Sequence, residues 1–158
     1  MSKIIVEQSA KVHAPSDLVY SIIADYKVGH QDIIPKKYFK TFHIEKGGYG
    51  EGTEIKFGMV VMGRKIEAHQ QVLEPEPGKV LVEQDVDSDR ATRFVVEPDG
   101  NSGESIVTIT TSWTPNGIMG FFERFTAPSV LRKIYREELA ILNSYAAKKV
   151  GGMKIHPN

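Results

Sequence analysis

The sequence contains no cysteine, a single tryptophan and no long hydrophobic run. The absence of cysteine excludes disulfide bonds, thiolate nucleophiles, and metal sites that depend on thiolate ligands. No segment approaches the roughly 18 apolar residues that a transmembrane helix needs, and the N-terminal residues lack the apolar core of a signal peptide. Lys plus Arg and Asp plus Glu both number 20, so no excess of basic charge favours nucleic acid. We therefore expect a cytoplasmic protein with no integral membrane segment and no nucleic-acid partner.

The length of the chain and its content of β-branched residues favour a single domain rich in β-sheet. The 158 residues fit a single domain, since domains commonly have about 100–150 residues. Isoleucine and valine together number 30 against six leucines, and β-branched residues favour strands. We expect one domain over residues 1–150, followed by a flexible tail over 151–158, because Gly151 and Gly152 interrupt the preceding helical pattern.

Hydrophobic periodicity predicts the order of the elements. Apolar and polar residues alternate over 4–14, which predicts a strand with one buried face. Pro15 followed by polar residues is typical of a helix start, and we expect short helices over 15–26 and 29–34. Alternation then returns and predicts six more strands joined by short turns, over 38–46, 53–62, 65–74, 79–86, 91–97 and 104–114.

The last third of the chain has a helical period, with Leu131, Tyr135, Leu139 and Leu142 on one apolar face. Proline removes a backbone donor and clashes with the preceding turn. At Pro128 we therefore expect a kink or break, giving a short helix near 118–126 and a long one over about 128–149.

These elements predict an α+β architecture. We expect a curved, seven-stranded antiparallel sheet wrapped around a long C-terminal helix, with two short helices between the first and second strands. One helix cannot fill the whole concave face of such a sheet. We therefore expect a cavity between them, in the range of about 300–1,000 Å³ that binds small molecules.

Several stretches resemble one protein superfamily. They are the segments VHAPSDLVY (12–20), IADY (23–26), GGYGEGT (47–53) and VLEPEP (72–77), followed by the long C-terminal helix. Over residues 2–149 the chain resembles the START-like (SRPBCC) superfamily, in its polyketide cyclase/dehydrase and lipid-transport branch. The resemblance implies the helix-grip fold that birch-pollen-type allergens share. The chain departs from it at VGHQDIIP (28–35), where the family often carries tryptophan.

We expect large apolar side chains to line the cavity. In each strand, the alternate set with the larger apolar residues should face the helix, and the aromatic start of the last helix should complete the lining. Such a cavity would bind a small hydrophobic molecule such as a lipid, polyketide, isoprenoid or quinone, because apolar burial contributes about 25 cal/mol per Å². The predicted ligand-binding residues are Phe42, Phe57, Met59, Phe94, Ile109, Trp113, Met119, Phe122, Phe125, Leu131 and Tyr135.

No established catalytic motif is present. No two of the five histidines lie three to five residues apart, so no helical metal-binding pair exists, and we expect neither a metal nor a cofactor. His69 and Glu67 share one strand face, and with Arg93 and Tyr135 they are candidates for a general acid or base.

Two other functions fit the same sequence. The first is an enzyme of the polyketide cyclase, aromatase or dehydratase type that uses the same cavity. The second is a protein-interaction or assembly module, which exposure of Phe121 and Phe122 would favour. Whether the chain is an enzyme, and whether it is a monomer or a homodimer, stays open at this point.

Overall fold

The computed structural model describes residues 2–155, and it describes their side chains except at 118–125 and 154–155. The predicted fold class is confirmed, and the boundaries of the strands and short helices lie within two residues of those predicted. The elements in chain order are β1 (Ile4–Val12), α1 (Ser16–Ala24), α2 (Gly29–Ile33), β2 (Phe39–Lys46), β3 (Glu54–Val61), β4 (Arg64–Glu76), β5 (Val80–Asp85), β6 (Ala91–Pro98), β7 (Ser105–Trp113) and α3 (Gly117–Ile155).

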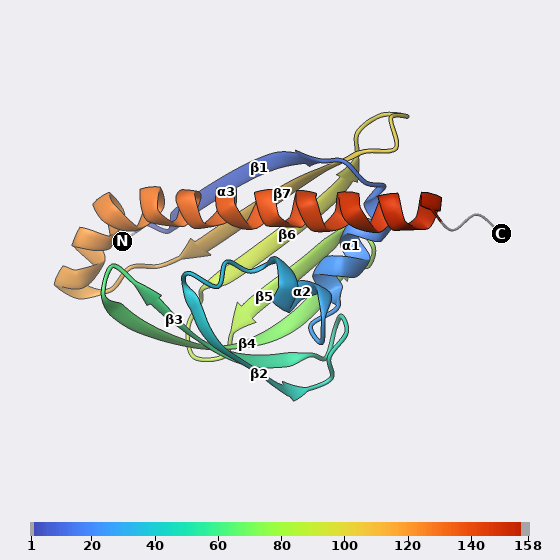
Figure 1. The fold of residues 1–158 in the computed structure, drawn as a ribbon. Coiled ribbons are helices and arrows are strands. Elements are labelled where there is room, and N and C mark those ends of the chain that lie inside the picture. Colours follow the sequence, from blue (N-terminus) through green and yellow to red (C-terminus); the bar gives the residue numbers. More distant parts are fainter. Residues whose placement is uncertain (1, 156–158) are drawn as a thin grey trace.

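The seven strands form one antiparallel sheet in the order β1-β7-β6-β5-β4-β3-β2. Strands β2 to β7 follow one another as hairpins, and β1 pairs with β7 at the far edge. The sheet curves around α3 (Figure 1). The link from β1 to β2 must cross from one edge of the sheet to the other, and its helices α1 and α2 contact α3 on the way.

Helix α3 is continuous from Gly117 to Ile155, with Pro128 inside it. The predicted division into two helices at Pro128 is therefore wrong, and the helix also extends past the predicted end at 149. A proline removes one backbone hydrogen bond and disturbs one turn. Ala127 and Leu131, on either side of it, both pack on the sheet against a small cluster that includes Trp113, and this packing holds the two turns in line.

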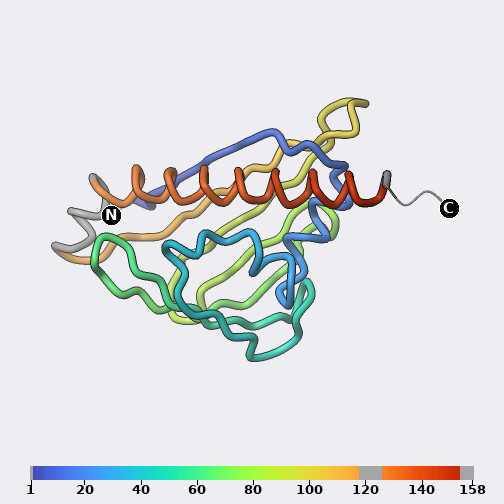
Figure 2. The backbone as a smooth tube through the Cα atoms, in the orientation of Figure 1, coloured from blue at the N-terminus to red at the C-terminus, as the bar shows by residue number. Residues whose placement is uncertain are grey.

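The apolar core lies beneath the C-terminal half of α3. Leu139, Leu142 and Ala146 belong to one buried cluster with Leu81 of β5 and Phe94 of β6. The trace in Figure 2 shows that β1, at the edge of the sheet, runs alongside α3. No helix among the described residues is both long and apolar enough to cross a membrane.

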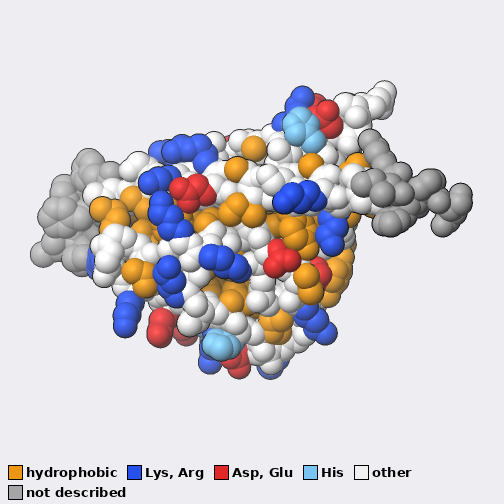
Figure 3. Space-filling model, viewed as in Figure 1, with side chains coloured by type: hydrophobic (Ala, Val, Ile, Leu, Met, Phe, Trp, Pro, Cys, Tyr) orange, Lys and Arg blue, Asp and Glu red, His pale blue; other side chains and the backbone are white. Residues whose placement is uncertain are grey.

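The outer face of α3 is basic. Arg132, Lys133 and Arg136 are exposed on it, and Figure 3 shows Lys and Arg side chains spread along this face among hydrophobic ones. The helix is thus amphipathic, as its apolar spacing predicted, and its apolar face is directed at the concave side of the sheet.

Candidate functional site

A cavity of about 460 Å³ lies between the concave face of the sheet and α3. Side chains of α2, α3 and strands β2 to β7 line it. Many of its apolar lining residues are half-exposed, which means that they face open space instead of packed core. These apolar walls are formed by Phe39, Phe42, Phe57, Met59, Val61, Ala68, Val130 and Leu131.

The cavity opens between the β3–β4 hairpin and the residues of α3 that follow 125. Met62, at the tip of the hairpin, is 80% exposed, and Arg64 and Lys65 beside it are also exposed. Met62 and Gly63 both have positive φ, as a two-residue hairpin turn with the twist of its strands requires. Lining residues at the opposite end are buried, so the described residues close the cavity at its inner end.

A row of polar side chains, which we call the polar belt, crosses the inner end of the cavity. The belt consists of Gln70, Asp85, Glu83, Thr92 and Thr111, and all five line the cavity. Strand pairing accounts for the row, because Gln70 lies opposite Asp85, Glu83 opposite Thr92, and Thr92 opposite Thr111. Residues directly opposite each other point to the same face of a sheet. The belt therefore separates the apolar walls near the mouth from the apolar core.

Glu83 is held by two partners from the β1–β2 link. The Tyr26 hydroxyl donates a hydrogen bond of 2.7 Å to Glu83 Oε2, and burial, followed by the Glu83 charge, raises the pKa of Tyr26 well above 10. His30 Nδ1 lies 2.7 Å from the Ile23 carbonyl oxygen, which can only accept, so Nδ1 carries a proton. His30 Nε2 then faces Glu83 Oε2 at 3.3 Å. His30 and Glu83 thus form a buried pair at the inner end of the cavity.

The packing of α2 on α1 places His30 at the inner end. The Asp25 carboxylate accepts hydrogen bonds from the backbone amides of residues 27–29, which fixes the start of α2. A Cβ atom on Gly29 would lie 2.6 Å from the carbonyl oxygen of Ile22, so the close approach of the two helices requires glycine. His30 also stacks on Tyr26, with ring centroids 4.3 Å apart.

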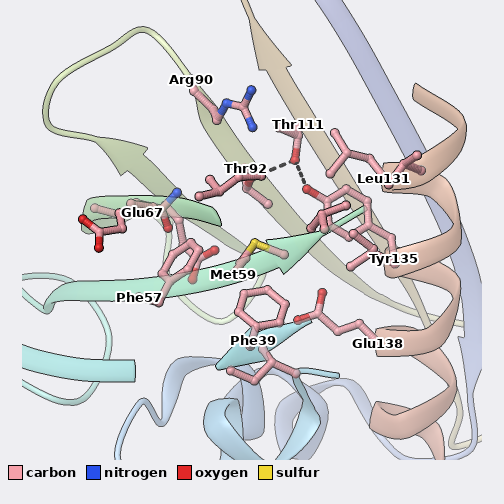
Figure 4. Close-up of a pocket in the computed structure, with 18 of the residues that line it drawn as sticks. Phe39, Phe57, Met59, Glu67, Arg90, Thr92, Thr111, Leu131, Tyr135 and Glu138 are labelled. Atoms are coloured by element: carbon pink, nitrogen blue, oxygen red, sulfur yellow. Dashed lines mark hydrogen bonds between the residues drawn. The ribbon is translucent and has the colours of Figure 1, made fainter. Parts of the chain in front are cut away.

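Hydroxyl groups connect the sheet to α3 at the other end of the polar belt. Thr92 Oγ1 and Thr111 Oγ1 are 2.8 Å apart, and Thr111 Oγ1 is hydrogen-bonded to the Tyr135 hydroxyl (Figure 4). Burial raises the pKa of Tyr135 to about 12, so this hydroxyl keeps its proton at neutral pH. The chain of three hydroxyls fixes Tyr135 against β7.

Two polar groups in the cavity lack a partner. Glu138 follows Tyr135 by three residues on α3, is 4% exposed, and reaches into the cavity (Figure 4); its carboxyl group has no hydrogen bond to any described residue. Burial, followed by the nearby Glu83 carboxylate, raises the pKa of Glu138 to about 8. Gln70, also 4% exposed, donates from Nε2 to Asp85 Oδ1 at 2.9 Å, while its Oε1 has no partner. Buried polar groups are normally paired, so both groups can form hydrogen bonds with a molecule inside the cavity.

Most of the predicted ligand-binding residues with described side chains line the cavity. Ile109 is buried in the core and Trp113 packs against Ile4 and Val6, because α3 lies directly on that part of the sheet and leaves no space there. Met119, Phe122 and Phe125, and also Phe121, lie outside the residues whose side chains are described. Those that line the cavity are Phe42, Phe57, Met59, Phe94, Leu131 and Tyr135.

Of the four candidate acids and bases, Tyr135 alone lies at the inner end of the cavity. Glu67 is exposed at the rim, and Figure 4 shows its carboxylate directed away from Tyr135. His69 and Arg93 neighbour Gln70 and Thr92 in the sequence, so strand alternation turns them to the opposite face. His69 there is hydrogen-bonded to Glu54, and this bond is the main reason that the pKa of Glu54 is lowered.

Sequence reasoning missed the residues that carry most of the polar chemistry. A signal was available for those on strands, because Gln70, Glu83 and Thr92 stand where the alternation places inward-facing residues. Glu138 adjoins the apolar stripe of the last helix in the same way. A polar residue in an apolar position of a periodic segment marks a buried polar group that needs a partner.

Comparisons with known proteins agree with this fold. A family model described as polyketide cyclase/dehydrase and lipid transport matches residues 3–147. The solution structure of KanY protein (ms6282) is 26% identical with a TM-score of 0.79, over 93% of this chain and 99% of that chain. The Zhui aromatase/cyclase from Streptomyces sp. R1128 is 18% identical with a TM-score of 0.77, over 94% and 96%.

A more distant structure shows the same fold at lower identity. Norcoclaurine synthase from Thalictrum flavum, in complex with dopamine and hydroxybenzaldehyde, is 13% identical with a TM-score of 0.70, over 93% of this chain and 88% of that chain. No curated protein sequence matches the chain. Since the family match spans nearly the whole length, the protein belongs to the polyketide cyclase/dehydrase and lipid transport family.

Proposed function

We propose that the protein binds a small, mostly hydrophobic molecule in the cavity between the sheet and α3. The observation that supports this most directly is the cavity of about 460 Å³, whose apolar walls are half-exposed although the surrounding core is closely packed. The membership of a family described by lipid transport and polyketide cyclisation is consistent with such a role.

The two ends of the cavity suit different parts of one molecule. Near the mouth, Phe57, Met59 and Val61 offer apolar surface, and each 100 Å² of apolar area removed from water contributes about 2.5 kcal/mol. At the inner end, the polar belt and Glu138 need hydrogen-bonding partners. A ligand with an apolar body and one polar end therefore enters with the polar end first.

A pair of neighbouring substitutions tests this proposal. Val61 lines the cavity, whereas Val60 precedes it on β3 and points to the other face of the sheet. Val61→Trp fills space in the cavity and should weaken binding of the fluorescent probe anilinonaphthalene sulfonate by about tenfold or more, because an indole occupies its site. Val60→Trp, the matched control, should bind the probe as the wild type does.

The purified protein supplies a second measurement. Native mass spectrometry and organic extraction should recover an apolar molecule from the wild type and from Val60→Trp, and not from Val61→Trp. If wild-type protein neither retains an apolar molecule nor binds the probe, ligand binding is rejected.

A second candidate function, an enzyme of the cyclase or dehydratase type, is favoured by Glu138. A carboxyl group with a pKa of about 8 exchanges its proton readily near neutral pH, and it faces a cavity with largely apolar walls. Nitrobenzisoxazole tests this capacity, because a buried carboxylate can remove its ring C–H proton while the N–O bond breaks to give a coloured phenolate. Turnover should rise with pH to a plateau above about 8. Glu138→Gln should abolish it, and turnover that persists in this variant rejects the role of Glu138.

A further inference from the structure

We propose that the molecule bound in this cavity carries a protonated amine, and that Glu138 holds this amine at the inner end. The inference rests on the ligand-binding function proposed above, and it names the chemical class of the ligand. It follows from a count of donors and acceptors around the cavity and from the distribution of charge between its two ends.

The unpaired groups at the inner end lack hydrogen-bond donors. Gln70 Oε1 can only accept, and its assignment is fixed because Gln70 Nε2 donates to the Asp85 carboxylate. Glu138 accepts at two oxygens once it is ionised. A ligand carbonyl would pair with protonated Glu138 but would leave Gln70 Oε1 without a partner. N–H donors on a ligand are the kind of partner that both groups lack.

The charge at the inner end also favours a cation. Glu83 already has two partners, because His30 Nε2 lies 3.3 Å from its Oε2 and the Tyr26 hydroxyl donates a hydrogen bond to it. Glu138 has no such partner. The basic side chains among the described lining residues are His30, Arg64, Lys65 and Arg90. Arg64 and Lys65 are exposed at the mouth, and the guanidinium of the half-buried Arg90 lies over the Trp113 ring, 4.4 Å from its centre. A cation inside the cavity would neutralise Glu138, whereas an anion would meet two carboxyl groups there.

Binding of an amine must then release the proton of Glu138. The ionisable groups that surround this carboxyl group are Glu83 of β5, His30 of α2, Tyr26 after α1 and Tyr135 of α3. Of these groups, His30 is the one that can carry a positive charge, and it is already paired with Glu83. Glu138 therefore keeps its proton at neutral pH without ligand and loses it to solvent when the ammonium group arrives.

Three matched probes distinguish the ligand classes by titration calorimetry: phenylbutylamine, phenylbutanol and phenylbutyrate. They share an apolar body and differ in the polar end. A charge-assisted hydrogen bond in a buried site predicts that the amine binds roughly tenfold to a hundredfold more tightly than the alcohol. An alkyl amine stays protonated up to about pH 10. Its affinity should therefore rise about tenfold from pH 7 to pH 9 and then level off, because Glu138 no longer has a proton to lose.

Two variants identify the responsible group. In Glu138→Gln the advantage of the amine over the alcohol and its pH dependence should both disappear, while the alcohol binds as before. Glu137→Gln is the matched control, because Glu137 precedes Glu138 on α3 but accepts a hydrogen bond from Tyr38 and does not line the cavity. This variant should keep the preference for the amine.

The results separate this inference from the proposal on which it rests. If the alcohol or the acid binds the wild type as tightly as the amine, the amine inference is wrong and ligand binding stands. If the amine is preferred equally by wild type and Glu138→Gln, Glu138 is not its partner. If no probe binds and no apolar molecule is retained, both proposals fail. The comparison of probes on the wild type decides the matter even if Glu138→Gln does not fold.

Discussion

The unpaired carboxyl group of Glu138 should make the empty protein less stable as the pH rises. In the folded protein the pKa of Glu138 is raised from 4.5 to about 8. The folded state therefore holds this proton more tightly than the unfolded state, and stability falls as pH rises between these values. One pKa unit corresponds to about 1.4 kcal/mol. From about pH 5 to about pH 9, Glu138 should remove about 4 kcal/mol from the free energy of unfolding.

Glu138→Gln removes this titration while it keeps the shape of the side chain. The free energy of unfolding of ligand-free protein can be measured by urea unfolding, followed by circular dichroism, at several pH values. Between about pH 5 and about pH 9, this free energy should increase by about 4 kcal/mol in the variant relative to the wild type. Glu137→Gln should follow the wild-type curve. Parallel curves for the wild type and Glu138→Gln would refute the reasoning, because they would mean that Glu138 ionises as easily in the folded protein as in the unfolded chain.

Three further substitutions test how the cavity is built. Gly29→Ala should destabilise the protein by about 2 kcal/mol in urea unfolding, because its Cβ atom would overlap a backbone carbonyl of α1. Tyr135→Phe should cost about 1 kcal/mol in thermal unfolding through the loss of its neutral hydrogen bond to Thr111. Tyr26→Phe should cost more, about 2–3 kcal/mol, because it removes a donor to the buried Glu83 carboxylate; equal effects of the two would contradict the charge assigned to Glu83.

The fold could be predicted from the sequence because the periodic signal is strong. Alternation of apolar residues gave the strands within two residues, and the turns between them fixed an antiparallel order. The error at Pro128 has a physical cause, since a local rule for helix breaking was applied where contacts with the sheet decide the outcome. No pattern within the helix itself reveals that Ala127 and Leu131 both rest on the sheet.

The cavity could be predicted in its apolar part more than in its polar part. Phe57 and Met59 face inward in a regular alternation, and side-chain size identifies them. The pairing of His30 with Glu83 joins residues 53 positions apart through the packing of α2, which no periodicity describes. The prediction for His69 and Glu67 shows the same limit, because His69 lies on the outer face of β4 and Glu67 lies at the rim with its carboxylate directed away from Tyr135.

The polar belt ties recognition to the register of the hairpins. Glu83 and Thr92 face inward because β5 and β6 pair as they do. A slip of one residue in β6 would turn Thr92 outward and bring Arg93 to the concave side. Such a chain would bury an extra guanidinium group and lose the link through Thr111 to Tyr135. Molecules with this slip would therefore be less stable and would also lack the inner end of the proposed binding site, so the fraction of molecules in a preparation that bind a ligand would report the fidelity of its strand pairing.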